Sequence, residues 1–303
     1  MGLFGRKKRE PGAGAGAGAA PSLVVLARRV LAERGVETTV EGPADDPSAA
    51  RLRGSDGQVY LFGNLAGMLE GADAATQEAA VRRHLDAMLA SRSDPAAEDM
   101  SPDELRQRIR LRLLAERGPD GIDLSYARPF VPGVVAALCV DFPTTVATLS
   151  AETVHRLPLG IDELFAIGQL NSDDEPVDQQ SEVAPGFVVV EGESLFTASK
   201  AVNLPAVLGA LPYGAVIAIP HRHLLLAVPI RDADSLTAVN TLAGALVQLV
   251  SDPRGAPGGV LSDRLLFARD GEVSIVSSFD PESGAMRIEV DERFQEALEQ
   301  AMA

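Results

Sequence analysis

The sequence contains one cysteine, no tryptophan and three tyrosines among its 303 residues. The single thiol, Cys139, cannot form an internal disulfide, so a reducing cytoplasm is the simplest setting. Few aromatic rings leave few surfaces on which unpaired bases could stack, and a formal net charge of −16 repels phosphate backbones. We therefore expect no nucleic-acid partner.

Long apolar runs are also missing. Apolar residues make up 46% of the chain, but charged residues such as Arg222 and Asp232 interrupt every stretch well before the ~20 residues of a membrane span. The first ten residues carry the basic cluster Arg6 to Arg9, and Gly/Ala repeats follow it instead of the apolar core of a signal peptide. The sequence predicts neither a transmembrane segment nor export.

Composition divides the chain into four segments. Residues 1–21 form a basic and Gly/Ala-rich tail that we expect to be disordered. Two apolar and four basic side chains of this tail could touch an anionic membrane surface, although they give only marginal attraction. We predict a small N-terminal α+β subdomain over 22–92, a linker and helix over 93–121, and a larger α+β domain over 122–303.

Helices are expected where apolar residues recur at steps of three and four, as they do in 22–34, 74–90 and 234–250. A further helix is expected from Ser101, because Ser-Pro-Asp-Glu can form a capping box with proline in the first turn. Its apolar face would consist of Leu105, Ile109 and Leu113.

The arginines around this expected helix form a basic surface that could hold an anionic ligand or an acidic partner. We favour a simpler interpretation, in which these arginines are solvated and face the protein's own acidic segment, residues 162–182.

Strands are expected in pairs. The expected strands include 122–127 and 134–142, and hairpins at 51–62, 214–230 and 265–276. In the last hairpin the turn is Asp270-Gly271, which favours a tight connection. The tip of the middle hairpin, Pro220-His-Arg-His223, is expected to be a solvated turn that follows a helix starting at Phe196. Single helices between strand pairs predict an α+β fold, in which antiparallel strand pairs and hairpins pack with amphipathic helices in two α/β layers or subdomains.

Local catalytic motifs are lacking. The sequence has no phosphate-binding Gly-x-x-x-x-Gly-Lys, no Gly-x-Ser-x-Gly, no His-Glu-x-x-His and no Cys-x-x-Cys. Ser199 and Lys200 could suggest a nucleophile and a base, but adjacent helical residues point about 100° apart. We expect Ser199 to bond to backbone amides instead.

Two imidazoles form the one chemically suggestive cluster. His221 and His223 could bind a metal ion if Asp263, Glu193 or Asp141 converged on them, and none of these carboxylates is a sequence neighbour of the pair. His221 with Asp141 is also the candidate catalytic pair.

Four segments in this order and spacing resemble the YtpQ-like family, a domain of unknown function. They are Leu138–Phe142, Leu157–Asn171, Phe196–Ser199 and Ala218–Leu226. The resemblance covers about residues 122–280, with a weaker similarity in 22–90. His223 stands where the family pattern has an aspartate, and Thr197 where an acidic residue is commoner. The resemblance implies a cytoplasmic bacterial α+β protein and no particular reaction.

These observations favour a non-enzymatic protein-interaction or adaptor module with a protein partner and no cofactor. The alternative is a metal-dependent or His-assisted hydrolase that uses His221 with Asp141 or Asp263. Its candidate metal ligands are His221, His223 and Asp263.

Overall fold

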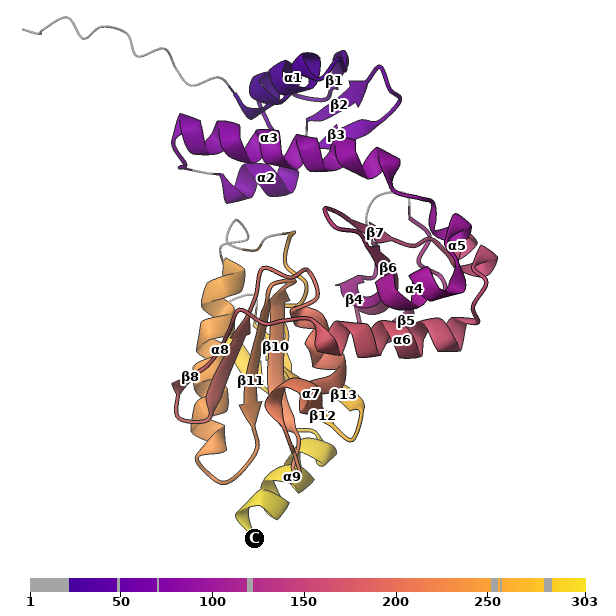
Figure 1. Ribbon diagram of the computed structural model, residues 1–303. Coiled ribbons are helices and arrows are strands. Elements are labelled where there is room, and N and C mark those ends of the chain that lie inside the picture. Colours follow the sequence, from indigo (N-terminus) through magenta and orange to yellow (C-terminus); the bar gives the residue numbers. More distant parts are fainter. Residues whose placement is uncertain are drawn as a thin grey trace, which may run out of the picture.

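The structure is a computed structural model that describes residues 22–303 except 48–49, 70, 119–121, 252–255, 257 and 281–284. Its helices and antiparallel sheets confirm the predicted α+β class (Figure 1). The predicted tail, residues 1–21, lies outside the described residues. Within the part that is described, no helix is both long enough and apolar enough to cross a bilayer.

The N-terminal unit is a three-stranded antiparallel sheet covered by helices. Its elements are α1 (Leu23–Glu33), β1 (Thr38–Glu41), β2 (Arg51–Gly54), β3 (Val59–Leu61), α2 (Gly63–Met68) and α3 (Ala74–Ala90). Ser22 and Asp73 cap α1 and α3 by accepting a backbone N–H, as serine and aspartate commonly do at the start of a helix. The unit has a hydrophobic core of its own, which includes the buried Leu31, Tyr60 and Leu85.

The middle unit is a second small sheet with its own helices. Its elements are the 3₁₀ turns η1 (Ser91–Ser93) and η2 (Ala97–Asp99), α4 (Pro102–Arg108), β4 (Ile109–Ala115), β5 (Arg128–Val131), β6 (Val134–Asp141), β7 (Val146–Thr148), α5 (Ala151–Arg156) and α6 (Ile161–Asp174). The strand order is β4-β6-β5, and β7 also pairs with β6. All of these pairings are antiparallel.

The long helix expected from Ser101 is wrong beyond Arg108. The capping box at Ser101 and Glu104 forms as predicted, but the chain turns extended at Ile109 and continues as β4. Residues 105, 109 and 113 fit a four-residue step, whereas Ile109, Leu111 and Leu113 equally fit the two-residue step of a strand. Pairing with β6 over the full length of β4 decides for the strand.

Helix α6 lies directly against β4 and covers one face of this sheet. A Cβ atom at Gly168 would come within 3.2 Å of the β4 backbone at Arg110 and Leu111, so a glycine permits this close approach. The hydroxyl of Ser172 donates to the Leu111 carbonyl (2.9 Å) and accepts the Leu111 N–H (2.8 Å). The outer edge of β4 is therefore hydrogen-bonded without another strand.

The C-terminal unit is built on a six-stranded antiparallel sheet in the order β13-β12-β10-β11-β9-β8. Its elements are β8 (Gln179–Ala184), β9 (Phe187–Glu191), η3 (Ala198–Asn203), α7 (Leu204–Leu208), β10 (Ala215–His221), β11 (Leu224–Pro229), α8 (Ser235–Ser251), β12 (Leu266–Arg269), β13 (Glu272–Ile275), β14 (Ser277–Phe279), β15 (Met286–Ile288) and α9 (Glu292–Met302). Strands β14 and β15 form a separate pair.

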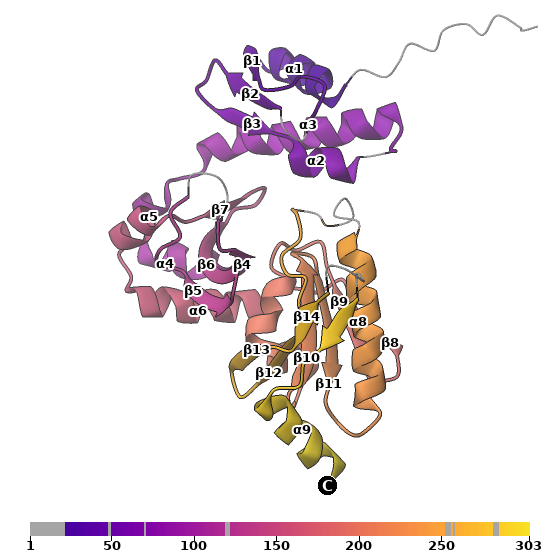
Figure 2. The same ribbon diagram turned by 180° about the vertical axis from the view of Figure 1, so that it is seen from behind.

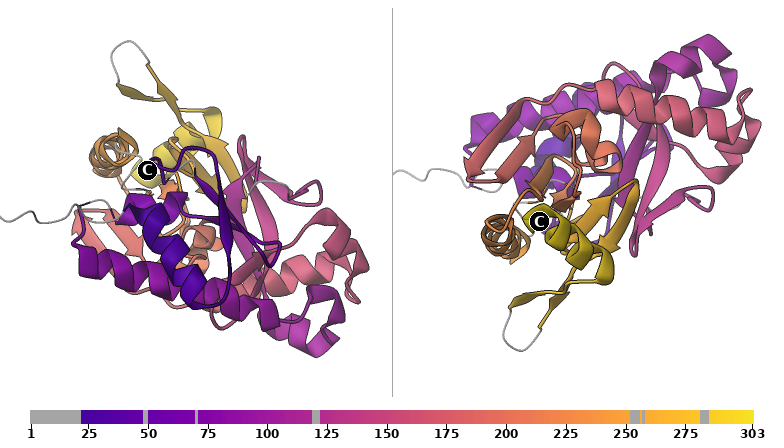
Figure 3. Two further views of the ribbon diagram at one scale, coloured as in Figure 1. Left: turned by 90° about the horizontal axis from the view of Figure 1, so that it is seen from above. Right: turned by 90° about the horizontal axis from the view of Figure 1, so that it is seen from below.

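The two faces of the six-stranded sheet face different cores. Helix α8 lies along one face (Figure 2), and Figure 3 shows it nearly end-on, on one side of the strands. Val216 and Ala218 of β10 pack on this side. Ile217 and Ile219 point the other way, into a core shared with β4, β6 and α6 of the middle unit. The middle and C-terminal units thus share one core.

Three further local expectations need correction. Residues 122–127 form no strand, because the hydroxyl of Tyr126 turns inward to bond the backbone of Leu138 and Leu149. The helix expected from Phe196 is a 3₁₀ helix followed by the short α7, which has a proline in its first turn. The turn of the middle hairpin is only Arg222-His223, and it is part-buried, not solvated.

Candidate functional site

The two imidazoles lie side by side at the turn between β10 and β11. His221 is only 9% exposed, and its ring centroid lies 6.3 Å from that of His223. The Nδ1 of His223 lies 3.0 Å from the Gly192 carbonyl, and its Nε2 accepts the Nε–H of Arg222 at 3.0 Å. This pattern of one donor and one acceptor requires a neutral His223 ring.

Both rings favour the neutral form. Burial, together with the neighbouring His223 and Arg222, lowers the pKa of His221 to about 4. Burial, followed by the charge of Arg222, also lowers the pKa of His223. At neutral pH the cluster therefore presents uncharged imidazoles beside a cationic guanidinium.

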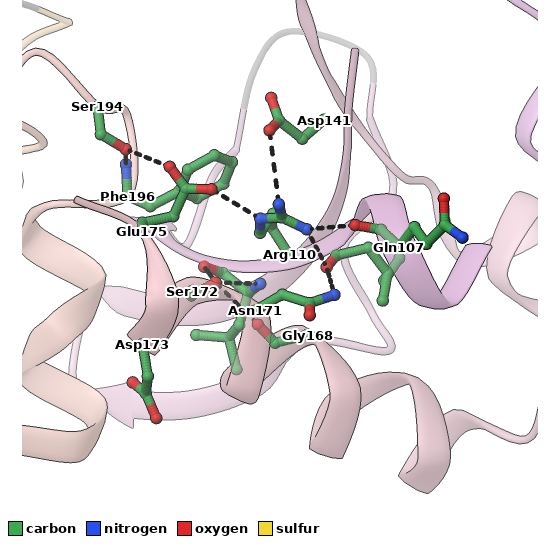
Figure 4. A network of polar contacts seen from close by, with 12 residues as sticks. Gln107, Arg110, Asp141, Gly168, Asn171, Ser172, Asp173, Glu175, Ser194 and Phe196 are labelled. Atoms are coloured by element: carbon green, nitrogen blue, oxygen red, sulfur yellow. Dashed lines mark hydrogen bonds and ion pairs between the residues drawn. The ribbon is translucent and has the colours of Figure 1, made fainter. Parts of the chain in front are cut away.

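The carboxylates named as catalytic or metal candidates are engaged by arginines. Asp141 ends β6 and lies 3.9 Å from Arg110, which also bonds Glu175 at 2.9 Å (Figure 4). Burial raises the pKa of Asp141. Asp263 lies 3.2 Å from the adjacent Arg264. Among the residues that the structure describes, no group of three or more His, Cys, Asp or Glu side chains could hold a metal ion.

Ser199 and Lys200 have separate structural roles. The hydroxyl of Ser199 accepts the backbone N–H of Leu113 at 2.9 Å. Lys200 is 4% exposed, and its ammonium donates to the carbonyls of Ser172, Asp173 and Glu175 at 3.3, 3.0 and 2.7 Å. It thereby caps the carboxyl end of α6, where a positive charge also complements the helix dipole.

Burial lowers the pKa of Lys200. The carbonyl ligands nonetheless give its ammonium a full set of hydrogen-bond acceptors.

Two arginines that the sequence did not single out complete the polar cluster. Arg112 lies on β4 and Arg222 in the hairpin turn, and both are part-buried. The buried Nε of Arg112 has no hydrogen-bond partner. Burial, followed by the charge of Arg112, lowers the pKa of Arg222 to about 10, so the two guanidinium groups are electrostatic neighbours.

Backbone contacts hold these two arginines in place. Strand alternation puts Arg110 and Arg112 on the face of the middle sheet opposite to Leu111, which packs into the shared core. Next to Arg112, the Leu113 N–H bonds to Ser199 of η3. The N–H of Ala198, also in η3, donates to the Arg222 carbonyl at 3.0 Å. A single 3₁₀ helix therefore ties the strand that bears Arg112 to the turn that bears Arg222.

A separate cavity of about 760 Å³ lies between the middle unit and the β12–β13 hairpin. Its lining includes Leu111 and Phe165 of the middle unit, Leu204 of α7 and Val273 of β13. This volume is in the range that binds small ligands or a group of inserted side chains.

Polar groups surround the apolar lining of this cavity. The guanidinium of Arg128 stacks over the Phe165 ring at 4.0 Å and bonds Asp162 at 2.6 Å. Arg269 lies 3.5 Å from Asp270 and donates to Gln300 at 2.7 Å. The buried Nε of Arg269 has no hydrogen-bond partner among the described residues, although the guanidinium is near Asp270. The cavity therefore favours an apolar occupant with a polar end.

One composition signal could have pointed to Lys200. The chain has only three lysines, and Lys7 and Lys8 lie in the tail, so Lys200 is the single lysine in a body that otherwise uses arginine. A lysine ammonium reaches three converging carbonyls more readily than a planar guanidinium. No comparable local signal marks Arg112, since its neighbours are joined to it only through long-range contacts.

No family model matches the chain, and comparisons with curated proteins and with solved structures found none similar to it.

Proposed function

We propose that this protein is a non-enzymatic interaction or adaptor module. One observation carries the proposal: the side chains with catalytic potential are held by structural bonds. Ser199 bonds a backbone amide, Lys200 bonds three carbonyls, and Asp141 lies beside Arg110. A nucleophile or base needs its reactive atom within reach of a substrate, and these atoms are already engaged.

The binding surface that we propose is the mouth of the cavity along α6. Ala166 is exposed and lines the cavity. Leu170, four residues later on the same side of the helix, is 67% exposed, the largest exposed fraction among the large apolar residues described. An apolar anchor that fills a pocket, surrounded by further apolar contact, is the usual arrangement of a protein-interaction hot spot. The partner is thus a protein segment that inserts an apolar side chain.

Two further assignments belong to the same proposal. The four segments described above support membership of the YtpQ-like family. The single cysteine, buried at position 139, supports a cytoplasmic setting.

Affinity capture with the full chain tests the proposal. Wild type, Ala166→Trp and Ala79→Trp are compared as baits at low and at moderate salt. Ala166→Trp places a large side chain at the cavity mouth, whereas Ala79→Trp makes the same change on the exposed side of α3. We expect a reproducible partner that wild type and Ala79→Trp retain, and that Ala166→Trp binds roughly tenfold more weakly or not at all.

The opposite result is equally clear. Recovery of no reproducible partner, together with hydrolysis of a substrate that is lost in His221→Ala, would favour the hydrolase that uses His221 with Asp141 or Asp263. Metal bound to the purified protein and released by the same substitution would favour its metal-dependent form.

A further inference from the structure

We propose that Arg112 and Arg222 form a binding site for an oxyanion, the phosphate or carboxylate group of a small ligand. The site lies on the face of the middle sheet that α6 does not cover, next to the β10–β11 turn. It is separate from the cavity and does not depend on the interaction proposed above.

The positive charges of Arg112 and Arg222 are not balanced by a neighbouring carboxylate in the part of the chain that the structure describes. Most other part-buried arginines in the described chain contact a carboxylate, as Arg110 and Arg269 do, or stack on an aromatic ring, as Arg108 does on Phe142 at 5.6 Å. Arg112 and Arg222 have neither kind of contact among the described residues. Two neighbouring cations that are partly removed from water repel each other, and an anion between them removes that cost.

The carboxylates nearest to this face of β4 bind Arg110 and not Arg112. Arg110 lies on the same face as Arg112, two residues before it. Asp141 and Glu175 both lie against Arg110 (Figure 4). These two carboxylates repel each other, and the position of Arg110 between them balances their charge. The neighbouring positions thus differ, since Arg110 has two carboxylates and Arg112 has none.

The buried Nε of Arg112 lacks an acceptor in the described part of the chain. This atom has almost no contact with solvent and no hydrogen-bond partner in the described residues. Around it, Ala137 lies opposite Arg112 across the strand pair, and the buried Cys139 is two residues further along β6. Burial raises the pKa of the Cys139 thiol, although the charge of Arg112 and a side-chain hydrogen bond with Arg112 oppose that rise. The neutral thiol is a weak acceptor that brings no negative charge to Arg112. A ligand oxygen would give the unpartnered donor its acceptor.

The site is also preorganised. The Nε of Arg222 is fixed on His223, which leaves the outer nitrogens of its guanidinium for a ligand. The backbone at Gly258 lies against the same guanidinium, where an added Cβ would come within 2.8 Å of Nη1. Helix η3 also anchors the chain beside both arginines, because the Ser199 hydroxyl accepts the N–H of Leu113, next to Arg112, and the Ala198 N–H donates to the Arg222 carbonyl. The side chain of Arg222 therefore loses little entropy when an anion binds.

The chemistry suits a planar or tetrahedral oxyanion. A guanidinium donates two parallel hydrogen bonds to carboxylate or phosphate oxygens, and two guanidiniums can hold one such group from two sides. The neutral imidazole of His221 adds a polar group beside Arg222 without adding a charge. The geometry is common to phosphate and carboxylate groups, so the experiment separates them.

Calorimetric titration of the full chain tests the site. The probes are inorganic phosphate and acetate, each at constant ionic strength, with chloride as the reference salt. The variants Arg112→Gln and Arg222→Gln are compared with Arg28→Gln, which makes the same charge change at an exposed arginine of α1. We expect one anion per chain, with a dissociation constant raised roughly ten- to a hundredfold in the two site variants and unchanged in Arg28→Gln.

Preference for phosphate would identify a phosphorylated ligand, and preference for acetate a carboxylate ligand. The site is refuted if wild type responds to phosphate and acetate no more than to chloride, or if Arg112→Gln binds as well as wild type. Arg112→Lys and Arg222→Lys keep the positive charge but remove the two parallel N–H donors of the guanidinium. They replace either glutamine variant that fails to fold. A dissociation constant that is unaltered in these lysine variants also refutes the site.

Discussion

The arginines of the N-terminal unit and those beside the β10–β11 turn are placed in opposite ways. On the surface of α1 and α3, Arg34 bonds Asp86 at 2.9 Å, and Arg82 bonds Glu33 and Glu78 at 2.6 and 2.7 Å. These groups lie on the surface of the helices, where Arg82 and Glu78 are partly covered, and they alternate in sign. Such pairs add little stability but keep a helical surface soluble.

Near the turn, Arg112 and Arg222 are part-buried and lie near each other without a carboxylate. The contrast teaches that charge in this chain has two uses. Where arginines are solvated they are neutralised by neighbours along the helices, and where they are partly buried two are left for a ligand. If this comparison is correct, substitutions in the two regions change the free energy of unfolding by different amounts and even in opposite directions.

The largest effect is expected at Lys200. Lys200→Met leaves three carbonyls at the end of α6 without their donor, and we expect the free energy of unfolding to fall by about 2–4 kcal/mol. The matched substitution Arg82→Met removes the surface ion pairs with Glu33 and Glu78 and should leave the unfolding midpoint nearly unchanged. Urea unfolding followed by circular dichroism measures both. Equal losses in the two variants would contradict a structural role for the buried ammonium.

The next effect is a pH dependence that comes from His221. Because its pKa is lowered from 6.5 to about 4, the unfolded chain binds a proton in this range that the folded chain does not. Stability is therefore complete above pH 6.5 and is lost as the pH falls towards 4, by about 2 kcal/mol between pH 7 and pH 5. The charged and titratable groups that face this ring are Arg222 and His223.

His221→Gln removes this contribution, so unfolding curves of the variant at pH 7 and pH 5 should differ by that much less than those of wild type. His155→Gln, at an exposed position of α5, serves as the control and should behave as wild type. An unchanged pH dependence in His221→Gln would show that the ring is not held neutral by its surroundings.

The smallest effect concerns the sign of a charge removal. Arg112→Met removes one of two neighbouring cations, and at low salt we expect the ligand-free protein to gain about 1 kcal/mol in free energy of unfolding. Arg34→Met breaks an attractive pair with Asp86 and should lower stability slightly. Salt should reduce both changes. A loss of stability in both variants would erase the difference between the two regions.

Local sequence signals predicted many of the elements. The caps at Ser22, Asp73 and Ser101, and the Asp270-Gly271 turn, were predictable because each depends on residues within a few positions. Both turn residues have positive φ, 54° at Asp270 and 79° at Gly271, as this kind of hairpin requires.

Long-range contacts explain most of what the sequence could not predict. The segment from Ile109 to Ala115 fits both a helix and a strand, and only its pairing with β6 and its bonds to Ser172 and Ser199 distinguish them. The sequence predicted that Arg112 lies on a solvated helix. Its position near the β10–β11 turn could therefore not be predicted.

Side chains predicted from the sequence partly define the site. The sequence drew attention to His221 and His223. Arginines do face the acidic segment, as Arg106 does with Glu163 and Arg110 with Glu175, but Arg110 is part-buried and not solvated as expected. The proposal that the imidazoles gather acids stays a prediction. Their closest charged neighbour in the structure is the guanidinium of Arg222.

A crystal structure of the full chain with selenate tests the oxyanion site most directly, because selenium scatters anomalously and selenate is a tetrahedral oxyanion like phosphate. The account predicts an anomalous peak between Arg112 and Arg222, with selenate oxygens within hydrogen-bond distance of both guanidinium groups. A map with no peak there, and with Arg112 instead bonded to a carboxylate of its own chain, would contradict it.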